Sequence, residues 1–339
     1  MKVAGLPEGA VRLGSAALKF PDGSYGVTFL GDGKRFAMLN NNRIRIFETA
    51  GTKEVRGWEA DKHVLLAIAA TPDGKRIASG GNNDMIRLWD ADTGKMIRQF
   101  NKHVGGRVFS LNFSEDGKYL VSLGSEKEQT KGSEIGIDSP FFQGLRVWEV
   151  ETGTELPAFK GGLPAGMKGE FTPDGKNLVW RDEITWREGF GKVHMRPLTG
   201  TAEQTQTWDN KDKTKWVIPF AYPDDGWGPL TGKSGAFALD WHFNIWDGNK
   251  EREIVRYKLD QVNVVPQVNF YKVRFSADRR FVASAGHYEG IVLWEPAKGT
   301  RRTLLPGNGY YGLDFTRDGK TLIACGHYEI RIFDVATGK

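Results

Sequence analysis

A short turn sequence recurs through nearly the whole chain, at intervals of roughly forty to sixty residues. It consists of Asp-Gly, then a basic residue, then a short apolar run. The clear copies are "GDGKRFAML" (31–39), "PDGKRIASG" (72–80), "EDGKYLVSL" (115–123), "PDGKNLVW" (173–180) and "RDGKTLIAC" (317–325). A sixth copy, "ADRRFVASA" (277–285), has arginine in place of the glycine, and a degenerate copy begins at Asp224. Because a recurring period indicates a repeated structural unit, the seven copies predict seven units.

A second pattern follows each turn and keeps the same phase. It is an alternating apolar run that ends in Trp or Phe and an acidic residue: "IRIFET" (44–49), "IRLWDADTG" (86–94), "LRVWEVETG" (145–153), "FNIWDGN" (243–249), "IVLWEPAKG" (291–299) and "IRIFDVATG" (330–338). The fourth unit has only "VHMRPLTG" (193–200), with Arg196 in place of the aromatic residue. Because these two patterns are independent and keep the same spacing relative to each other, they indicate a repeated structural unit.

Each unit reads as four short strands joined by tight turns. Glycine adopts positive φ at little cost, so Asp-Gly predicts a hairpin turn. The content of 43 glycines with 39% hydrophobic residues also favours an all-β chain with a substantial core. Four short strands cannot bury both faces of their sheet, so neighbouring units are expected to stack face to face.

The units resemble the tryptophan-aspartate (WD) repeats of β-propellers, most closely over "HVLLAIAATPDGKRIASGGNNDMIRLWDADTGK" (63–95). The resemblance implies seven radial blades of four antiparallel strands around a channel. The family's His-Ser-Asp-Trp hydrogen-bond set is matched by His63, Ser79 and Trp89, with Asn83 at the aspartate position, and His103 begins the third unit. "LPEGAVRLG" (6–14) resembles the lead-in to propellers appended to larger bacterial proteins.

The last unit stops after its third strand, and an isolated alternating stretch, 11–20, precedes the first unit. We expect 11–20 to complete the last blade and close the ring. The expected organisation is one domain, 1–339, with approximate repeats 21–60, 61–102, 103–162, 163–209, 210–262, 263–306 and 307–339.

Charge and composition narrow the function classes. A net charge of +5, with 47 basic and 42 acidic residues and no long run of like charge, does not favour nucleic acid as a partner. One cysteine, Cys325, excludes an internal disulfide framework and a cysteine zinc cluster. No secretory signal or apolar membrane span is recognisable, so the expectation is a cytoplasmic monomer that does not contact the membrane.

Two regions depart from the minimal repeat. An insertion, 124–144, separates two strands of the third unit and reads as either a binding loop or a tolerated insertion. The stretch from Trp180 to Trp227 holds five tryptophans, which favours blade packing over a stacking surface for a ligand.

The segments "AGHYEG" (285–290) and "CGHYEI" (325–330) place Gly-His-Tyr-Glu twice, one repeat apart. His and Glu are residue types of metal sites and acid-base chemistry, but the expected separation of about 10–15 Å between neighbouring blades is long for one ion. Turn formation in a duplicated blade is the favoured interpretation, and a partner-contact rim is the second. No catalytic motif is present, so no catalytic residue, metal ligand or cofactor is predicted.

The sequence thus predicts a non-catalytic interaction platform whose protein or peptide partner binds the top face, where these turns lie. The expected contact residues are Arg107, Tyr271, Lys272, His287, Tyr288, Glu289, Tyr311, His327, Tyr328 and Glu329. The alternatives are a small-ligand or enzymatic site at the channel mouth, and a sensor or scaffold module of a larger bacterial signalling or redox protein.

Overall fold

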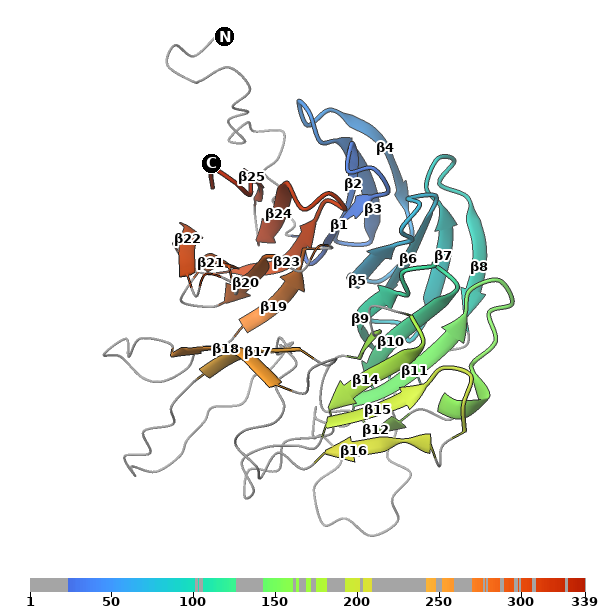
Figure 1. Cartoon of the computed structure of the whole chain (residues 1–339). Coiled ribbons are helices and arrows are strands. Elements are labelled where there is room, and N and C mark those ends of the chain that lie inside the picture. Colours follow the sequence, from blue (N-terminus) through green and yellow to red (C-terminus); the bar gives the residue numbers. More distant parts are fainter. Residues whose placement is uncertain are drawn as a thin grey trace, which may run out of the picture.

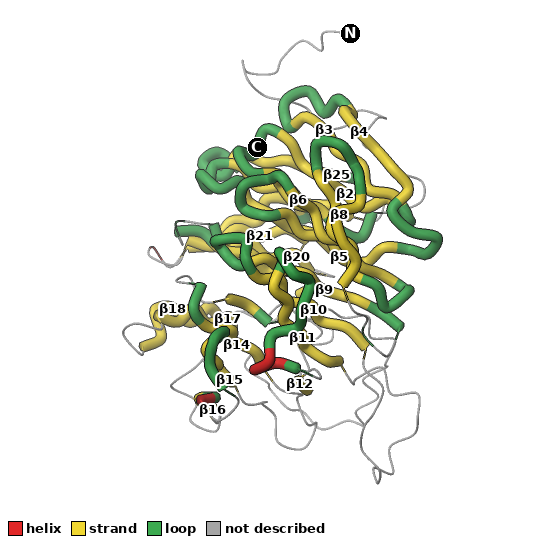
Figure 2. The backbone as a smooth tube through the Cα atoms, turned by 90° about the vertical axis from the view of Figure 1, so that its right-hand side faces the viewer, coloured by secondary structure: helices red, strands yellow, loops and turns green. Residues whose placement is uncertain are grey.

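The structure is a computed structural model that describes most of the chain from Ser24 to Gly338. The residues outside the description are 1–23, 101–102, 104–105, 126–142, 161–162, 165–168, 172–174, 182–192, 202–203, 209–241, 248–251, 259–269, 277, 279, 287–289, 296–297, 299, 307–308, 327–328 and 339. Nearly all the regular structure that Figure 2 draws is strand, so the prediction of an all-β chain is confirmed. One short 3₁₀ helix, η2 (Pro157–Phe159), interrupts the third sheet.

The described strands form antiparallel sheets, which we number in chain order. The first sheet contains β1 (Val27–Leu30), β2 (Arg35–Asn40), β3 (Arg43–Glu48) and β4 (Glu54–Glu59). The second contains β5 (Leu65–Ala70), β6 (Arg76–Gly81), β7 (Ile86–Asp90) and β8 (Met96–Phe100). The third contains β9 (Val108–Phe113), β10 (Tyr119–Ser125), β11 (Gln143–Glu149) and β12 (Leu163–Pro164). In each of them the strands pair in sequence order, as expected for hairpins joined by tight turns.

The later sheets are less regular. The fourth sheet contains β13 (Glu170–Phe171), β14 (Asn177–Arg181), β15 (Val193–Pro197) and β16 (Gln206–Trp208), and the fifth contains β17 (His242–Asp247) and β18 (Arg252–Lys258). The sixth contains β19 (Phe270–Phe275), β20 (Val282–Gly286), β21 (Gly290–Glu295) and β22 (Thr300–Leu305). The seventh contains β23 (Tyr310–Phe315), β24 (Thr321–Gly326) and β25 (Ile330–Asp334). The seventh sheet has three strands among the described residues, and the segment 11–20 expected to complete it lies outside them.

The recurring turn is built by the same hydrogen bonds in each of four sheets. In the second sheet Thr71 donates its hydroxyl to Asp73 Oδ1 at 2.6 Å, and Lys75 N–H donates to the same oxygen at 3.0 Å. The glycine between them, Gly74, has φ +71°, as the Asp-Gly pattern predicted. The same Ser/Thr-to-Asp bond occurs in the pairs Ser114–Asp116, Ser276–Asp278 and Thr316–Asp318. The hydroxyl residue two positions before the aspartate is therefore part of the repeat.

The sheets follow one another around the molecule, and Figure 1 shows the last sheet beside the first. Phe29 and Phe36 of the first sheet share a buried cluster with Ile323 of the seventh. Asp314 Oδ2, on β23, accepts the backbone N–H of Phe29 at 2.8 Å and the hydroxyl of Thr28 at 3.0 Å. Burial raises the pKa of Asp314, and the charge of Arg274 on the sixth sheet opposes that rise. Asp314 thus links the two ends of the described chain.

The Asp-Gly turns of neighbouring sheets are in close contact. A Cβ on Gly33 would lie 2.5 Å from Thr316 Cγ2, and one on Gly74 would lie 2.4 Å from the backbone nitrogen of Gly31. These contacts join the seventh sheet to the first and the first sheet to the second. Only glycine fits at both positions, because φ is positive and the neighbouring turn occupies the space of a side chain.

Buried tryptophans fix the third strands. Trp89, Trp148 and Trp294 donate their indole N–H to Ser79, Ser122 and Ser284 at 2.8–2.9 Å. In the third sheet His103 Nε2 also lies 2.8 Å from Ser122 Oγ, so a His-Ser-Trp set is complete there. In the second sheet the Ser79–Trp89 bond is present, but His63 Nδ1 lies 3.1 Å from Asp61 instead, because the Asp61 carboxylate is two residues away.

Arginines on outer strands connect consecutive sheets. Arg98 on β8 donates to the carbonyls of Thr152 and Glu151, in the turn after the third strand of the next sheet, at 2.7 and 2.5 Å. Arg56 on β4 and Arg302 on β22 make the same kind of bond to Thr93 and Ala336. The turn glycine Gly153 has φ +73°, and a Cβ there would lie 2.7 Å from Arg98 Cδ, so glycine suits this position.

Arg196 explains the aberrant fourth repeat. Its side chain is buried, and its guanidinium lies 5.3 Å from the ring centre of Phe159 and 5.2 Å from that of Trp180. The guanidinium also donates to Thr205 Oγ1 at 2.7 Å and to the carbonyl of Ala158. The cation thus fills the aromatic position through cation–π contacts.

Parts of the two divergent regions, 124–144 and 180–227, lie outside the described residues. The strands flanking the insertion reach further into it than expected, since β10 runs to Ser125 and β11 begins at Gln143. Trp180 is 4% exposed and its ring stacks on His194, as the blade-packing interpretation predicts for this tryptophan. β12 begins directly after the expected boundary at 162, although it pairs within the third sheet.

Candidate functional site

The strand register places the two Gly-His-Tyr-Glu turns at the same end of their sheets. Gly286 pairs with Gly290 across the turn in the sixth sheet, and Cys325 pairs with Ile330 in the seventh. We call this end, with the turn between second and third strands, the upper end. The lower end carries the Asp-Gly turn. His287, Tyr288, Glu289, His327 and Tyr328 lie outside the described residues.

The other predicted contact residues divide into two groups. Tyr271 and Lys272 lie near the upper end of β19, where Phe270 pairs with Gly286, and Tyr311 lies near the upper end of β23. Arg107 is exposed and directly precedes β9 of the third sheet. The first and second sheets lie between the third and the seventh, so the fold does not bring Arg107 beside the others.

Glu329 is the only His, Tyr or Glu of the two duplicated turns that lies among the described residues. Two neighbouring side chains hold it in place. Tyr310 donates its hydroxyl to Glu329 Oε1, and Arg331 Nη2 lies 2.7 Å from Oε2. Burial, together with the bond to Glu329, raises the pKa of Tyr310 above its usual range. Its bond to Glu329 also raises the pKa of Arg331. Both carboxylate oxygens are thus engaged within the chain, which fixes Glu329 as a positioned, partly exposed anion.

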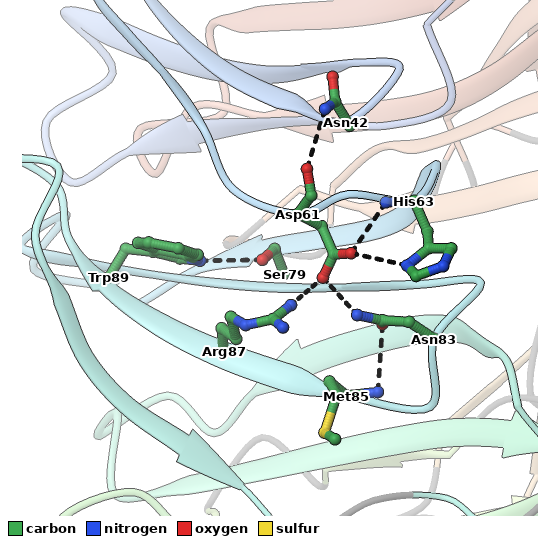
Figure 3. Close-up of polar contacts among 8 residues, drawn as sticks. All are labelled: Asn42, Asp61, His63, Ser79, Asn83, Met85, Arg87 and Trp89. Atoms are coloured by element: carbon green, nitrogen blue, oxygen red, sulfur yellow. Dashed lines mark hydrogen bonds and ion pairs between the residues drawn. The ribbon is translucent and has the colours of Figure 1, made fainter.

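A second polar cluster, which the sequence interpretation missed, lies between the first and second sheets. Figure 3 shows Asp61 at its centre, with its carboxylate facing His63, Asn83 and Arg87. The Asp61 side chain is 2% exposed and pairs with the Arg87 guanidinium and the Asn83 amide. Its own carbonyl accepts the Asn42 amide of the first sheet at 2.9 Å.

The electrostatics of Asp61 identify it as a structural anion. Burial alone raises the pKa of this carboxyl, but the N–H of His63, the His63 ring and the Arg87 charge outweigh burial and hold the pKa below its usual range. The signal in the sequence is the aspartate two residues before the leading histidine, in "EADKH" (59–63). Its partner Arg87 occupies the second position of the third-strand pattern, where "IRIFET", "LRVWEVETG" and "IRIFDVATG" also have arginine.

The described part of the chain contains no grouping of three or more His, Cys, Asp or Glu side chains arranged to hold a metal ion. None of its helices has the length and apolar character needed to cross a bilayer.

The repeats of this chain are similar to those of known WD-repeat proteins. The family model for the WD domain, G-beta repeat, matches residues 53–90 and 94–127. A WD repeat-containing protein WDS homolog of Arabidopsis thaliana is 24% identical over 77% of this chain and 51% of its own length. These matches support a WD-repeat protein. WD-repeat proteins are mostly non-enzymatic scaffolds that bind protein partners.

Two further similarities are more limited. Autophagy-related protein 18 of Saccharomyces cerevisiae is 31% identical over 28% of this chain and 20% of its own length. The chain therefore spans about half, or less, of the curated relatives it matches. A chain of Kuenenia stuttgartiensis hydrazine synthase superposes with a TM-score of 0.65 over 98% of this chain and 99% of its own length, at 14% identity. That likeness shows a β-propeller-like fold and nothing about activity.

Proposed function

We propose that this chain is a non-catalytic interaction platform, built as a seven-bladed β-propeller, that binds a protein or peptide partner at the upper end of its sheets. The observation that carries the proposal is the WD-repeat match at 53–127, in a family that mostly serves as scaffolds. The proposed contact residues are Arg107, Tyr271, Lys272, His287, Tyr288, Glu289, Tyr311, His327, Tyr328 and Glu329. We further propose a bacterial-type, cytoplasmic monomer.

The contacts between sheets support a rigid platform. The arginine bonds to neighbouring turns, the Asp61 cluster and the Asp314 bonds each cross from one sheet to the next. A surface held in this way presents its side chains at low entropic cost on binding, which favours affinity.

The chemistry of the upper end supports its choice as the binding surface. Tyrosines beside charged groups are frequent among the residues that dominate binding energy. Tyr311 is half-buried, and Glu329 is fixed by Tyr310 and Arg331, so both have restricted motion before a partner arrives.

The proposal is tested by co-purification with the variant Tyr271→Ala/Tyr311→Ala/Tyr328→Ala. Loss of these three tyrosine rings, at about 1–2 kcal/mol each, is expected to reduce recovery of the partner at least tenfold, as measured by quantitative mass spectrometry. The matched control is Val55→Ala/Met96→Ala/Ile97→Ala, which removes exposed apolar side chains from outer strands. If no co-purifying protein distinguishes the two variants, this surface is not the binding site.

Ring closure by 11–20 is tested by deleting residues 1–20. If this segment pairs with β25, its loss exposes the edge of the seventh sheet and removes one side of the contact with the first sheet. The expected result is a decrease of at least about 5 °C in Tm, measured by calorimetry, which corresponds to roughly 3–4 kcal/mol for a domain of this size. An unchanged Tm would show that the segment does not close the fold.

A further inference from the structure

A cleft of about 440 Å³ opens at the lower end of the sixth and seventh sheets. Apolar side chains line part of it: Phe281 and Leu293 from the sixth sheet and Val335 from the seventh. Arg280 follows the Asp278 turn and Val335 directly follows β25, so these positions lie at the opposite end of the strands from the proposed partner surface. The volume is within the usual range of ligand sites, about 300–1,000 Å³.

Basic side chains dominate the polar lining. Arg280, Lys298, Arg301 and Arg302 line the cleft together with a single carboxylate, Glu295. Lys298 Nζ lies 2.7 Å from Glu295 Oε1, and Arg280 Nε lies 2.5 Å from Asp278 Oδ2 in the preceding turn, so carboxylates offset two of the four cations. The excess of positive charge in the cleft therefore comes from Arg301 and Arg302.

Arg302 belongs to the fold as well as to the cleft. Its guanidinium donates to the carbonyls of Val335 and Ala336, the bond that ties the sixth sheet to the seventh. Because carbonyls are neutral acceptors, its positive charge is not cancelled by these bonds. Hydrogen bonds from Thr337 lower the pKa of Asp334, a residue at the end of β25, and the charge of Arg302 makes a smaller contribution in the same direction.

The basic character is specific to this pair of sheets. In β22, Arg301 pairs with Trp294, and in the second sheet the residue paired with the equivalent Trp89 is Met96. Met96 and the bulge residue Ile97 that follows it are exposed apolar side chains. The strand position that holds Met96 in β8 therefore holds a cation, Arg301, in β22. The arginine that bonds to the next sheet is present in both strands, as Arg98 and Arg302.

We infer that this cleft binds an acidic segment of a partner protein, with carboxylate side chains flanking an apolar one. Arginine guanidinium groups pair with carboxylates through two parallel hydrogen bonds, which suits Arg301 at the opening. Phe281 is half-buried at the cleft, and a compact inorganic ion would leave its remaining surface in contact with water, so the occupant is expected to carry an apolar group beside the anions. The inference does not depend on the upper-end surface, so either site can fail while the other stands.

The test measures fluorescence polarisation of a labelled peptide of alternating Asp-Asp and Leu residues, with the full chain. Saturable binding that weakens with salt is expected, since the charged rim is solvent-exposed. The peptide with Asn in place of Asp is expected to bind at least tenfold more weakly. Arg280→Ser/Arg301→Ser is expected to raise the Kd about tenfold or more, and Arg301→Lys to raise it less, because the charge is kept.

The controls separate the cleft from general charge and from the proposed partner surface. Lys95→Ser removes an exposed cation at the start of β8, and Tyr311→Ala alters the upper end; both are expected to leave the Kd unchanged. The inference is overturned by absence of saturable binding, by an unchanged Kd in the arginine double variant with normal melting, or by equal loss in Lys95→Ser. It is also overturned if inorganic phosphate displaces the peptide and Ala-for-Leu peptide binds equally well, which would indicate a general anion site.

Discussion

We expect Trp148→Ala to lower the free energy of unfolding by about 4 kcal/mol, the largest effect of any single substitution proposed for this chain. Trp148 is fully buried on the third strand of the third sheet, and its ring centre lies 5.9 Å from that of Phe100 on the second sheet. Removing the indole leaves a cavity between two sheets. Because two sheets line that cavity, it cannot close without moving one of them.

The polar end of the indole adds a second contribution. Its N–H donates to Ser122 Oγ at 2.8 Å, and the same oxygen lies 2.8 Å from His103 Nε2. Trp148→Phe keeps most of the packing and removes this N–H, so the expected loss is smaller, about 1–2 kcal/mol. Chemical denaturation of both variants separates packing from hydrogen bonding.

The matched control for Trp148 is Met96→Ala on outer strand β8. Met96 is 54% exposed, so its truncation is expected to change the free energy of unfolding by less than about 0.5 kcal/mol. A loss below about 1.5 kcal/mol for Trp148→Ala would contradict a packed interface between the second and third sheets.

The second large effect is expected for Asp61→Ala, at about 3 kcal/mol, because it removes one partner of a buried ion pair. The substitution leaves the Arg87 guanidinium, 19% exposed, without the carboxylate that pairs with it. It also removes the acceptor of the Asn83 amide and of the His63 N–H, between two sheets. Equilibrium unfolding in urea measures the loss.

Two variants show whether the pairing itself is responsible. Asp61→Ala/Arg87→Met removes both charges and is expected to recover part of the lost stability, since no unpaired cation remains. Asp92→Ala removes an exposed carboxylate, 64% exposed, that pairs with Arg35 at 2.8 Å, and is expected to cost less than about 1 kcal/mol. Equal losses in Asp61→Ala and Asp92→Ala would be inconsistent with a structural role for the cluster.

The pH dependence of Asp61→Asn follows from the lowered pKa. A carboxyl whose pKa is lower in the folded than in the unfolded chain contributes stability above its ordinary value of 3.8, and loses that contribution as pH falls through the folded value. The stability advantage of the wild type over Asp61→Asn is therefore expected to shrink as the pH falls below about 4. A difference that grows on acidification would have the wrong sign.

The sequence was sufficient to predict the elements but not the contacts between sheets. The alternating run at 86–94 begins with β7, and the Asp-Gly turns have the positive φ that their glycines indicated. Strand periodicity and turn chemistry act over a few residues, so they can be read locally. Arg98 looks like an ordinary surface residue in "MIRQF", and its bonds to Thr152 and Glu151 depend on how the next sheet stacks.

The sequence likewise predicted the position of the candidate site but not the side-chain contacts within it. The repeat period placed the two Gly-His-Tyr-Glu turns on adjacent sheets at one end, and the register of β20 with β21 and of β24 with β25 agrees. The partners of Glu329 did not follow from that pattern, because Tyr310 comes from a different strand. Asp61 was missed for the same reason, since Asn42, Asn83 and Arg87 come from separate strands and turns.

The central claim is that a partner protein binds the upper end of the sixth and seventh sheets. It is tested most directly by placing a photo-crosslinking amino acid at position 311, and in a matched chain at position 97, an exposed site on outer strand β8. After irradiation in native cells, a defined crosslinked partner is expected from position 311 and not from position 97. Crosslinking from position 97 alone, or none from 311 with the folded protein, would contradict the claim.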